Sequence, residues 1–242
     1  MPQIGFVCCD GEKRRFADCI QHALACQCPW TPAVLEAMAA NIRPEQPCLT
    51  VTELLGCARQ TVLKKQLDWY ETPASAYAKF RGSMFHKAIE GSNSGAIVEE
   101  RFAITLPSGV TISGQPDLIY PDQHLLLDFK TTRYIPKEPY AHHILQLNAY
   151  RYLVWETYEI WNLEVAYFDM SSCRRLPVPL MDLGKVESFL VQQGSAVTEG
   201  LTGSQLPERT GEDGLWQCGY CPFTAECWPQ GAPKKVRATA KA

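Results

Sequence analysis

The pattern of apolar and polar positions predicts a mainly helical front half. Apolar residues recur every three or four positions, the period of an amphipathic helix, in segments 31–42, 50–70 and 81–92. Thr31 with Pro32 suits the start of the first of these helices. Thr50 with Glu53 fits a capping box at the start of the second.

The pattern changes to a β-type one after residue 96. Segments 97–106 and 110–120 are rich in β-branched and aromatic residues and are joined by the turn sequence Pro-Ser-Gly. Segment 124–130 has the same character and follows the turn sequence Pro-Asp-Gln. We expect these three segments to form a three-stranded antiparallel meander.

A helix, a strand and a further helix are predicted beyond the meander. Helical spacing covers about 139–158 and 182–197, and the β-rich segment 163–170 lies between them. A helix between two strands of one sheet requires a crossover connection, so the sheet is expected to be mixed. The predicted fold class is α/β, a mixed sheet flanked by helices with a helical N-terminal part.

Composition and charge narrow the class of protein. With 46% hydrophobic and 20% charged residues, the 242-residue chain has the composition of a globular protein. We find no secretory signal and no apolar run long enough to span a membrane, so a cytoplasmic protein is expected. The formal net charge is -3. Segment 57–87 nevertheless holds six Lys and Arg against two Asp and Glu, which makes it a candidate DNA-binding surface or simply a solvated helical face.

Two aspartates and a lysine form the sharpest local signal. Asp117 ends one predicted strand, and Asp128 and Lys130 lie two positions apart on the next, so these two share one face. A connection over residues 121–124 sets Asp117 opposite Asp128, although Pro116 suggests a bulge there. Two carboxylates can bind a hard cation, and a nearby lysine can orient water or stabilise charge. By itself, such a pattern also fits a surface ion pair.

The order of four motifs resembles the PD-(D/E)xK nuclease superfamily, and more narrowly its RecB-like nucleases. Residues 116–117 and 128–130 resemble the second and third motifs of that family. Upstream, residues 82–86 are similar to its G-x-x-x-H helix. Downstream, residues 146–150 are similar to its Q-x-x-x-Y motif. The resemblance covers about residues 50–230 and implies a restriction-endonuclease-like fold.

The resemblance also implies roles for individual residues. The implied metal ligands are the side chains of His86, Asp117 and Asp128 and the carbonyl group of Phe129. Lys130 would orient the attacking water. Gln146 and Tyr150 lie one helical turn apart, where they would contact DNA or position the lysine. The implied cofactor at this site is Mn or Mg.

Eleven cysteines in a chain expected to be cytoplasmic indicate metal binding rather than disulfides. Near the end, Cys218, Cys221 and Cys227 form a triplet that by its spacing fits zinc as well as iron-sulfur. Cys57 resembles the lone upstream cysteine of RecB-like nucleases that carry a 4Fe-4S cluster, including the CRISPR-associated exonuclease family Cas-four. The resemblance therefore implies such a cluster on these four cysteines, with zinc as the alternative. Joining Cys57 to Cys218 would close a very long loop and stabilise the fold.

A second group of cysteines lies in front of the region that the resemblance covers. Segment 7–30 holds five cysteines, with His22 nearby: Cys8, Cys9, Cys19, Cys26 and Cys28. A candidate zinc site consists of Cys9, Cys19, Cys26 and Cys28, although their spacing is irregular. Cys48 and Cys173 are expected to be buried thiols.

These expectations divide the chain into five parts. Residues 1–48 form a cysteine-rich appendage and 49–95 a helical part with the first cluster cysteine. Residues 96–205 form the nuclease core and 206–230 the iron-sulfur region. The basic segment 231–242 is expected to be a flexible tail.

The expected function is that of a metal-dependent DNA exonuclease. The resemblance implies 5' to 3' action on single-stranded DNA and a part in CRISPR spacer acquisition, trimming or selecting DNA ends with the integrase proteins Cas-one and Cas-two. A RecB-like nuclease of phage replication or of repair fits the same motifs. A DNA-end-binding scaffold subunit with an idle metal site is the non-enzymatic alternative.

Overall fold

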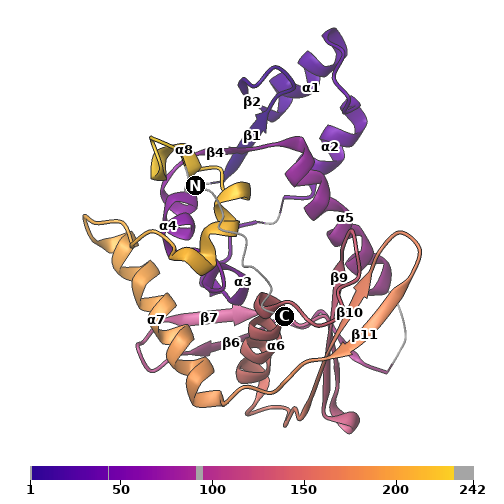
Figure 1. Ribbon diagram of the computed structural model, residues 1–242, viewed down its shortest axis with the longest axis vertical. Coiled ribbons are helices and arrows are strands. Elements are labelled where there is room, and N and C mark those ends of the chain that lie inside the picture. The colour runs from indigo at the N-terminus through magenta and orange to yellow at the C-terminus, as the bar shows by residue number, and fades with distance from the viewer. Residues whose placement is uncertain (1, 43, 91–94, 232–242) are drawn as a thin grey trace, which may run out of the picture. The chain divides into compact units, whose positions relative to one another are not determined.

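The computed structural model describes residues 2–42, 44–90 and 95–231 (Figure 1). The predicted tail at 231–242 therefore lies, except for Gly231, outside the described residues. The chain divides into two compact units, each built from separated segments. The cysteine-rich unit comprises Met1–Ile42, Gly56–Ala76 and Glu199–Ala242, and the sheet unit comprises Arg43–Leu55 and Tyr77–Thr198.

The cysteine-rich unit begins with a β-hairpin that the sequence analysis did not predict, although the front half of the chain is mainly helical as expected. Strand β1 (Gln3–Val7) pairs with β2 (Lys13–Arg15) in an antiparallel and with β4 (Trp69–Glu71) in a parallel arrangement. The buried ring of Phe6 packs edge-on against Phe16, the first residue of α1 (Phe16–Ala25). Strand β2 consists of three basic residues, so it lacks the alternation of apolar and polar residues that would predict a strand.

The two predicted helices that follow are present, but the second is interrupted. Helix α2 (Pro32–Ala40) starts after Thr31, whose side chain makes no capping hydrogen bond. Segment 50–70 breaks into α3 (Val51–Leu54) and α4 (Ala58–Gln66), and its end forms β4 instead of helix. The capping box at the start of α3 is confirmed, because Thr50 and Glu53 exchange side-chain and backbone hydrogen bonds.

The sheet unit contains two sheets where a single meander was predicted. The larger has the strand order β11-β10-β9-β8-β5 and the smaller β3-β7-β6. Segment 110–120 is interrupted at residues 115–117, so that its first part pairs in the smaller sheet and its second part in the larger. Pro116 lies at this interruption, where its missing N–H costs no ladder hydrogen bond.

The strand bounds show how short most of these elements are. The smaller sheet consists of β3 (Leu49–Thr50), β6 (Phe102–Thr105) and β7 (Thr111–Gly114). The larger consists of β5 (Ile97–Val98), β8 (Leu118–Tyr120), β9 (Leu125–Thr131), β10 (Asn162–Phe168) and β11 (Cys173–Pro177).

The predicted crossover and mixed sheet are confirmed. Strands β9 and β10 are parallel, and α6 (Ala141–Val154) connects them and packs against both. The flanking pairs β8–β9 and β10–β11 are antiparallel. Edge strand β11 was not predicted, because its mostly exposed, charged residues lack an apolar alternation. Helix α7 (Leu183–Thr202) follows, and none of the helices in the described ranges is long and apolar enough to cross a membrane.

Helix α5 (Pro73–Glu90) brings the motif residue His86 toward the larger sheet. It starts eight residues before the segment predicted at 81–92. Its Phe85 ring lies 4.5 Å from that of Phe168 on β10 and 6.0 Å from that of Phe129 on β9, measured between centroids. This apolar contact fixes the side of α5 that faces the sheet and thereby the position of the neighbouring His86.

Candidate active site and cysteine clusters

The hairpin of β8 and β9 brings the two motif aspartates together. Leu118 pairs with Leu127, so Asp117, one residue before β8, comes into register with Asp128, as the sequence predicts. The connection is a short 3-10 turn, Pro121–Gln123, closed by a left-handed His124. The backbone N–H of Phe129 donates to Asp117 Oδ2 at 2.6 Å and holds that carboxylate in place.

His86, Glu99 and Asp117 form a group that can bind one metal ion. Their ligand atoms all lie within 4.8 Å of one another. Nδ1 of His86 is 3.0 Å from Glu99 Oε1 and 3.1 Å from Asp117 Oδ1. Hydrogen bonds to Asp117 and Glu99 raise the pKa of His86 to about 9 against the effect of burial. The two acids thus create the negative potential that attracts a cation.

Glu99 belongs to this group although the sequence analysis missed it. Its backbone has φ 49°, a left-handed conformation that is strained for a residue with a side chain. Its N–H donates to the Asp117 carbonyl, and Gln115 donates to its Oε2 at 2.7 Å. Arg101 donates to Gln115 at 2.6 Å and so anchors the arrangement. The two acids Glu99 and Glu100, directly after β5, were the only hint in the sequence that a further ligand lies here. The strand pattern does not tell which of the two side chains faces His86 and Asp117.

Asp128 and Lys130 point to the same side of β9 and form an ion pair, as the alternation predicts. Burial and the nearby Asp117 raise the pKa of Asp128 to about 7, although Lys130 opposes this. Burial disfavours the charge on Lys130, but Asp128 and Asp117 outweigh that effect and raise its pKa. Lys130 is therefore a stable ammonium that can donate hydrogen bonds, not a base.

The surroundings of Asp128 fit a cation. It is buried, and its Oδ2 faces the ammonium group of Lys130 as its charged partner. Lys130 offsets only part of the cost of burying this carboxylate, because the pKa of Asp128 stays raised beside Asp117. A bound cation would reduce that cost further. Oxygen and imidazole ligands are also those that Mg and Mn accept. The donor set around Asp117 and Asp128 is thus suited to a divalent cation.

Gln146 and Tyr150 lie on α6 beside this charged group. Gln146 Nε2 donates to the Tyr150 hydroxyl at 3.0 Å. Burial raises the pKa of Tyr150 to about 12, and the charges of Asp128 and Lys130 also act on it. The phenol is therefore neutral and close to the ion pair. Gly114 makes room for it, since a Cβ there would lie 2.9 Å from the tyrosine ring.

Aromatic and imidazole side chains at the start of α6 form a further wall beside Lys130, which the sequence analysis also missed. His143 Nδ1 lies 2.7 Å from the Tyr167 hydroxyl, and burial together with Lys130 lowers the pKa of His143 to about 2. Tyr140 is 43% exposed, and its ring stacks on that of His142 at 5.7 Å. The wall is thus uncharged and partly open to solvent.

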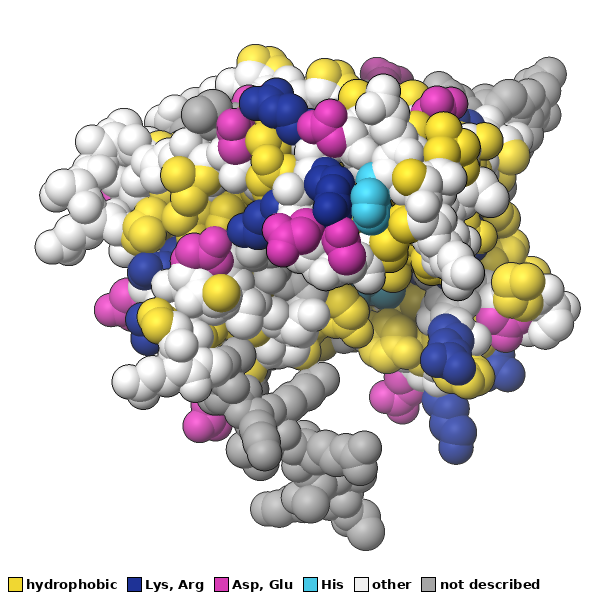
Figure 2. Space-filling model, turned by 90° about the horizontal axis from the view of Figure 1, so that it is seen from above, with side chains coloured by type: hydrophobic (Ala, Val, Ile, Leu, Met, Phe, Trp, Pro, Cys, Tyr) yellow, Lys and Arg dark blue, Asp and Glu magenta, His cyan; other side chains and the backbone are white. Residues whose placement is uncertain are grey.

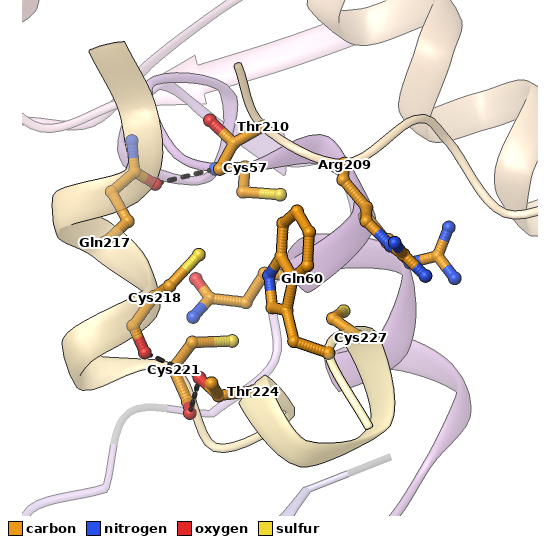
Figure 3. Close-up of a pocket in the computed structure, with 11 residues that line it drawn as sticks. Cys57, Gln60, Arg209, Thr210, Gln217, Cys218, Cys221, Thr224 and Cys227 are labelled. Atoms are coloured by element: carbon orange, nitrogen blue, oxygen red, sulfur yellow. Dashed lines mark hydrogen bonds between the residues drawn. The ribbon is translucent and has the colours of Figure 1, made fainter. Parts of the chain in front are cut away.

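The four predicted cluster cysteines come together in the cysteine-rich unit. Cys57, Cys218, Cys221 and Cys227 line one cavity with about 380 Å³ of unfilled space, part of it open to solvent. Figure 3 shows their side chains entering the same space from the start of α4, from the 3-10 segment Glu212–Tyr220 and its end, and from α8 (Thr224–Cys227). The grouping of Cys57 with the distant triplet is confirmed.

Hydrogen bonds fix the backbone around this cavity. The N–H of Cys57 donates to Gln217 Oε1 at 2.9 Å across 160 positions of sequence. The hydroxyl of Thr224 donates to the carbonyl groups of Cys218 and Cys221. Arg59 and Arg209 also line the cavity and supply positive charge near the thiols. These contacts hold the backbone of the four cysteines around one space.

A second cluster of cysteines includes residues that lie outside the predicted zinc set. Cys9 Sγ lies 3.4 Å from Cys26 Sγ, as expected for two members of the predicted set. The shortest contact of this cluster, 3.1 Å, joins Cys8 Sγ and His22 Nδ1, neither of which was in that set. The β-hairpin formed by β1 and β2 was not predicted. The sequence analysis therefore did not place Cys8, which follows β1, next to His22 on α1.

The two isolated cysteines, Cys48 and Cys173, are less buried than expected. Cys173 is exposed and Cys48 is half-buried, so the prediction of two buried thiols is wrong. Both lie in the sheet unit, whereas the other nine cysteines belong to the cysteine-rich unit. Cys173 lies on edge strand β11, the element that the sequence pattern did not reveal.

The charge distribution gives limited support to a basic DNA-binding face. The predicted segment 57–87 is divided between the two units, so it is not one continuous surface element. Lys64 within it lies over the Trp69 ring at 5.1 Å. On the face displayed in Figure 2, the Lys and Arg side chains are interspersed with Asp and Glu.

A match to a family model identifies the superfamily of the chain. The model of the PD-(D/E)XK nuclease superfamily matches residues 58–228, well over half of the chain. The chain belongs to this superfamily. It is a nuclease, an enzyme that hydrolyses DNA. The match begins one residue after Cys57 and leaves the N-terminal cysteines outside. No curated protein matches the sequence.

Solved structures similar to this nuclease include one that shares the fold over most of its length. The structure titled SSO0001 has a TM-score of 0.56 and 19% identity, covering 84% of this chain and 95% of its own. A putative exonuclease from Eubacterium rectale has a TM-score of 0.40 at 14% identity, covering 56% of both chains. A phage related exonuclease from Haemophilus somnus 129PT has a TM-score of 0.44 at 12% identity, covering 65% of this chain and 96% of its own.

Proposed function

We propose that this nuclease is a metal-dependent exonuclease that degrades single-stranded DNA in the 5' to 3' direction. The observation that carries the proposal is the group of His86, Glu99 and Asp117 within reach of one cation, with the Asp128–Lys130 ion pair beside it. Hydrolysis of a phosphodiester needs positive charge on the phosphoryl oxygens and an oriented water molecule. The residues around Asp117 provide the means for both.

The proposed roles follow from the chemistry of each group. His86, Asp117 and Asp128, with the carbonyl of Phe129, would hold Mn or Mg, and Glu99 joins them as a further ligand. When bound, the cation supplies charge stabilisation and lowers the pKa of water. The ammonium group of Lys130 donates hydrogen bonds that orient the water or the phosphate. Gln146 holds the hydroxyl of Tyr150 toward the same region.

Single-stranded DNA suits the aromatic side chains on this side of the sheet unit. Tyr140 is partly exposed and already stacks on His142, and Tyr134 is 69% exposed. Exposed aromatic rings bind unpaired bases by stacking without regard to sequence. The neutral state of His143 keeps a second positive charge away from Lys130.

Cleavage of end-labelled oligonucleotides tests the proposed activity. With Mn or Mg, the enzyme should shorten linear single strands from the 5' end and leave circular single strands intact. Lys130→Ala should abolish cleavage while Lys137→Ala, on the loop before α6, should not. Equal background cleavage by wild type and Lys130→Ala would support a DNA-end-binding scaffold instead, and removal from the 3' end would contradict the polarity.

We further propose that Cys57, Cys218, Cys221 and Cys227 hold a 4Fe-4S cluster. Tetrahedral zinc would draw thiolate sulfurs to about 3.8 Å from one another, given Zn–S bonds of about 2.3 Å. Among the described residues, no three of these four sulfurs lie mutually within 4.8 Å. The wider spacing and the neighbouring Arg59 and Arg209 favour a larger, anionic centre over one zinc ion.

The colour and metal content of the purified protein test the cluster. A brown protein with broad visible absorption and about four iron atoms per chain is expected. Cys57→Ala should lose the colour, whereas Cys173→Ala, which changes an exposed cysteine of the sheet unit, should keep it. A colourless protein with zinc bound in place of iron, lost on Cys57→Ala, would establish zinc at these four cysteines.

The biological role that we propose is the trimming or selection of DNA ends during CRISPR spacer acquisition. Its support is the resemblance of Cys57 and the cysteine triplet to the Cas-four family. Co-purification with the integrase proteins Cas-one and Cas-two, and loss of correct spacer length in Lys130→Ala cells, would be expected. Acquisition unaffected by deletion of the gene would favour a phage or repair role.

A further inference from the structure

The N-terminal cysteines are arranged as a closed ring of ligand atoms. Cys8 and Cys9 follow β1, and His22 and Cys26 lie one turn apart on α1 and at its end. His22 Nδ1 lies 3.1 Å from Cys8 Sγ and 3.5 Å from Cys26 Sγ, and Cys26 Sγ lies 3.4 Å from Cys9 Sγ. Ligand atoms of Cys8, Cys9 and His22 also lie within 4.8 Å of one another.

The three contacts between these ligand atoms are close to, or slightly shorter than, three of the six edges of a zinc coordination tetrahedron. Zn–S bonds of about 2.3 Å and Zn–N bonds of about 2.0 Å place sulfur atoms about 3.8 Å apart and sulfur and nitrogen about 3.5 Å apart. The observed S–S contact is 3.4 Å and the S–N contacts are 3.1 and 3.5 Å. Three of these ligand atoms lie mutually within 4.8 Å, whereas no three of the four cluster sulfurs form such a group among the described residues.

We propose that Cys8, Cys9, Cys26 and Nδ1 of His22 bind one zinc ion. Three thiolates and one imidazole saturate a tetrahedral ion and leave no open position, which is the mark of a structural and not a catalytic site. The site is separate from both the carboxylate group and the four cluster cysteines. It also lies outside the residues that match the nuclease family.

A carboxylate lies near the second ring nitrogen of His22. A histidine that binds metal through one ring nitrogen usually presents the other to a carboxylate or carbonyl group. Here His22 Nε2 lies 3.7 Å from Asp10 Oδ2. Arg14 donates to both oxygens of Asp10 at 2.6 and 2.7 Å, and the N–H of Glu12 donates at 3.1 Å. The Asp10 carboxylate is thus held where it can orient His22 with Nδ1 toward the thiols.

A neighbouring thiol, that of Cys19, contacts one of the proposed zinc ligands. Cys19 Sγ donates to Cys8 Sγ at 3.5 Å and is almost fully buried. A thiol that donates to a metal-bound thiolate delocalises its negative charge, as other second-sphere donors do. Cys19 therefore has a role as a hydrogen-bond donor to Cys8 rather than as a fifth ligand.

The proposed zinc ion would fasten the hairpin to α1. This hairpin and helix form a small element in which few residues, among them Phe6 and Cys19, are almost fully buried. Small elements with such limited cores depend on cross-links or metal ions for stability. Zinc would thus supply the link between β1 and α1 that a larger apolar core supplies elsewhere.

Metal analysis of the full-length protein tests the site. We expect one zinc per chain in addition to the iron of the cluster. The double variant Cys9→Ser/His22→Ala should lose the zinc and keep the iron, and the control Cys28→Ser/Cys173→Ser should keep both. A double variant is needed because Cys19 lies close enough to replace one lost ligand.

Two further measurements keep the test decisive if the double variant fails to fold. Wild-type protein prepared with cobalt should show the intense absorption of tetrahedral thiolate-bound cobalt. Asp10→Asn should weaken zinc binding about tenfold without changing iron content. Absence of zinc with a Cys9–Cys26 disulfide found by mass spectrometry would overturn the proposal. So would zinc that survives in the double variant but disappears in Cys57→Ala. None of these readouts depends on nuclease activity.

Discussion

At the scale of single residues, the surroundings of His86 connect the charges of the site to its chemistry. Its Nδ1 faces two carboxylates at 3.0 and 3.1 Å, and their attraction outweighs the cost of burying a charged imidazole. A cation bound at the same place must displace that proton. Protons and metal ions therefore compete for Glu99 and Asp117.

We expect Glu99→Gln to weaken cation binding about 10–100-fold, because an amide oxygen carries no charge to hold the metal. The change also removes one of the two acids that raise the pKa of His86. The concentration of Mn that gives half-maximal cleavage measures the effect. Glu100→Gln is the matched control, since Glu100 is exposed and adjacent. Equal Mn dependence of the two variants would remove Glu99 from the site.

A second residue-scale prediction concerns pH. The folded protein raises the pKa of His86 from 6.5 to about 9, so the stability that its proton contributes is complete below pH 6.5 and is lost as pH rises through 9. The raised pKa of Asp128 likewise makes the stability of the folded protein fall as pH rises from 3.8 to about 7. Glu99, Asp117 and Lys130 are the charged groups that set these values.

The increase of Tm on adding Mn should therefore be larger at pH 9 than at pH 6.5, because fewer protons compete with the cation at the higher pH. Thermal unfolding with Mn or with a chelator measures the difference. His86→Ala should reduce the pH dependence. An increase of Tm that is the same at both pH values in the wild type would contradict the assignment of His86 as a ligand.

At the scale of elements, β7 and α6 approach each other closely beside the site. A Cβ on Gly114 would lie 2.9 Å from the side chain of Leu153 and 2.9 Å from the ring of Tyr150. Both neighbours are buried and cannot move aside easily. The glycine thus allows the tyrosine to reach the region of Lys130.

We expect Gly114→Ala to destabilise the protein by about 1–3 kcal/mol through overpacking. Displacement of Tyr150 should also reduce cleavage, beyond what the loss of stability explains at low temperature. Urea unfolding and cleavage assays measure the two effects. Gly211→Ala is the control, since no atom lies within 4 Å of its Cβ position and its φ is negative. Equal stability of the two variants would show that α6 can shift away.

At the scale of the whole molecule, the cysteine-rich unit is assembled from the beginning, an internal piece and the end of the chain. Its four cluster cysteines join residues 160 or more positions apart. A metal centre there would restrict the unfolded chain strongly, because it closes a loop containing the whole nuclease sheet. The proposed centre is thus a structural link between distant segments.

We expect Cys57→Ala to lower the free energy of unfolding by roughly 3–5 kcal/mol, the range typical for removing a cross-link from a long loop. Denaturant unfolding under anaerobic conditions measures the change, with Cys173→Ala as the control. Cleavage should persist at low temperature, because no cluster cysteine lies among the carboxylates. An unchanged unfolding midpoint would show that the centre does not link these segments.

Features that depend on neighbouring residues could be predicted from the sequence. Periodicity located α6 and β9, the short turn after Tyr120 fixed the register of Asp117 and Asp128, and Thr50 with Glu53 formed the predicted capping box. These features follow from local geometry, which a few residues specify among themselves.

Contacts between distant side chains became apparent from the fold alone, and the sequence pattern did not reveal them. The examples come from both units of the chain. The fold brought Glu99 to His86, and Cys8 to His22, and it divided segment 110–120 between two sheets. Such contacts depend on how exposed or irregular segments turn, and a pattern of apolar positions carries little information about those turns. The members of the proposed metal sites that the sequence analysis missed, Glu99, Cys8 and His22, therefore lie where local signals are weak, because such polar residues do not follow the period of the core.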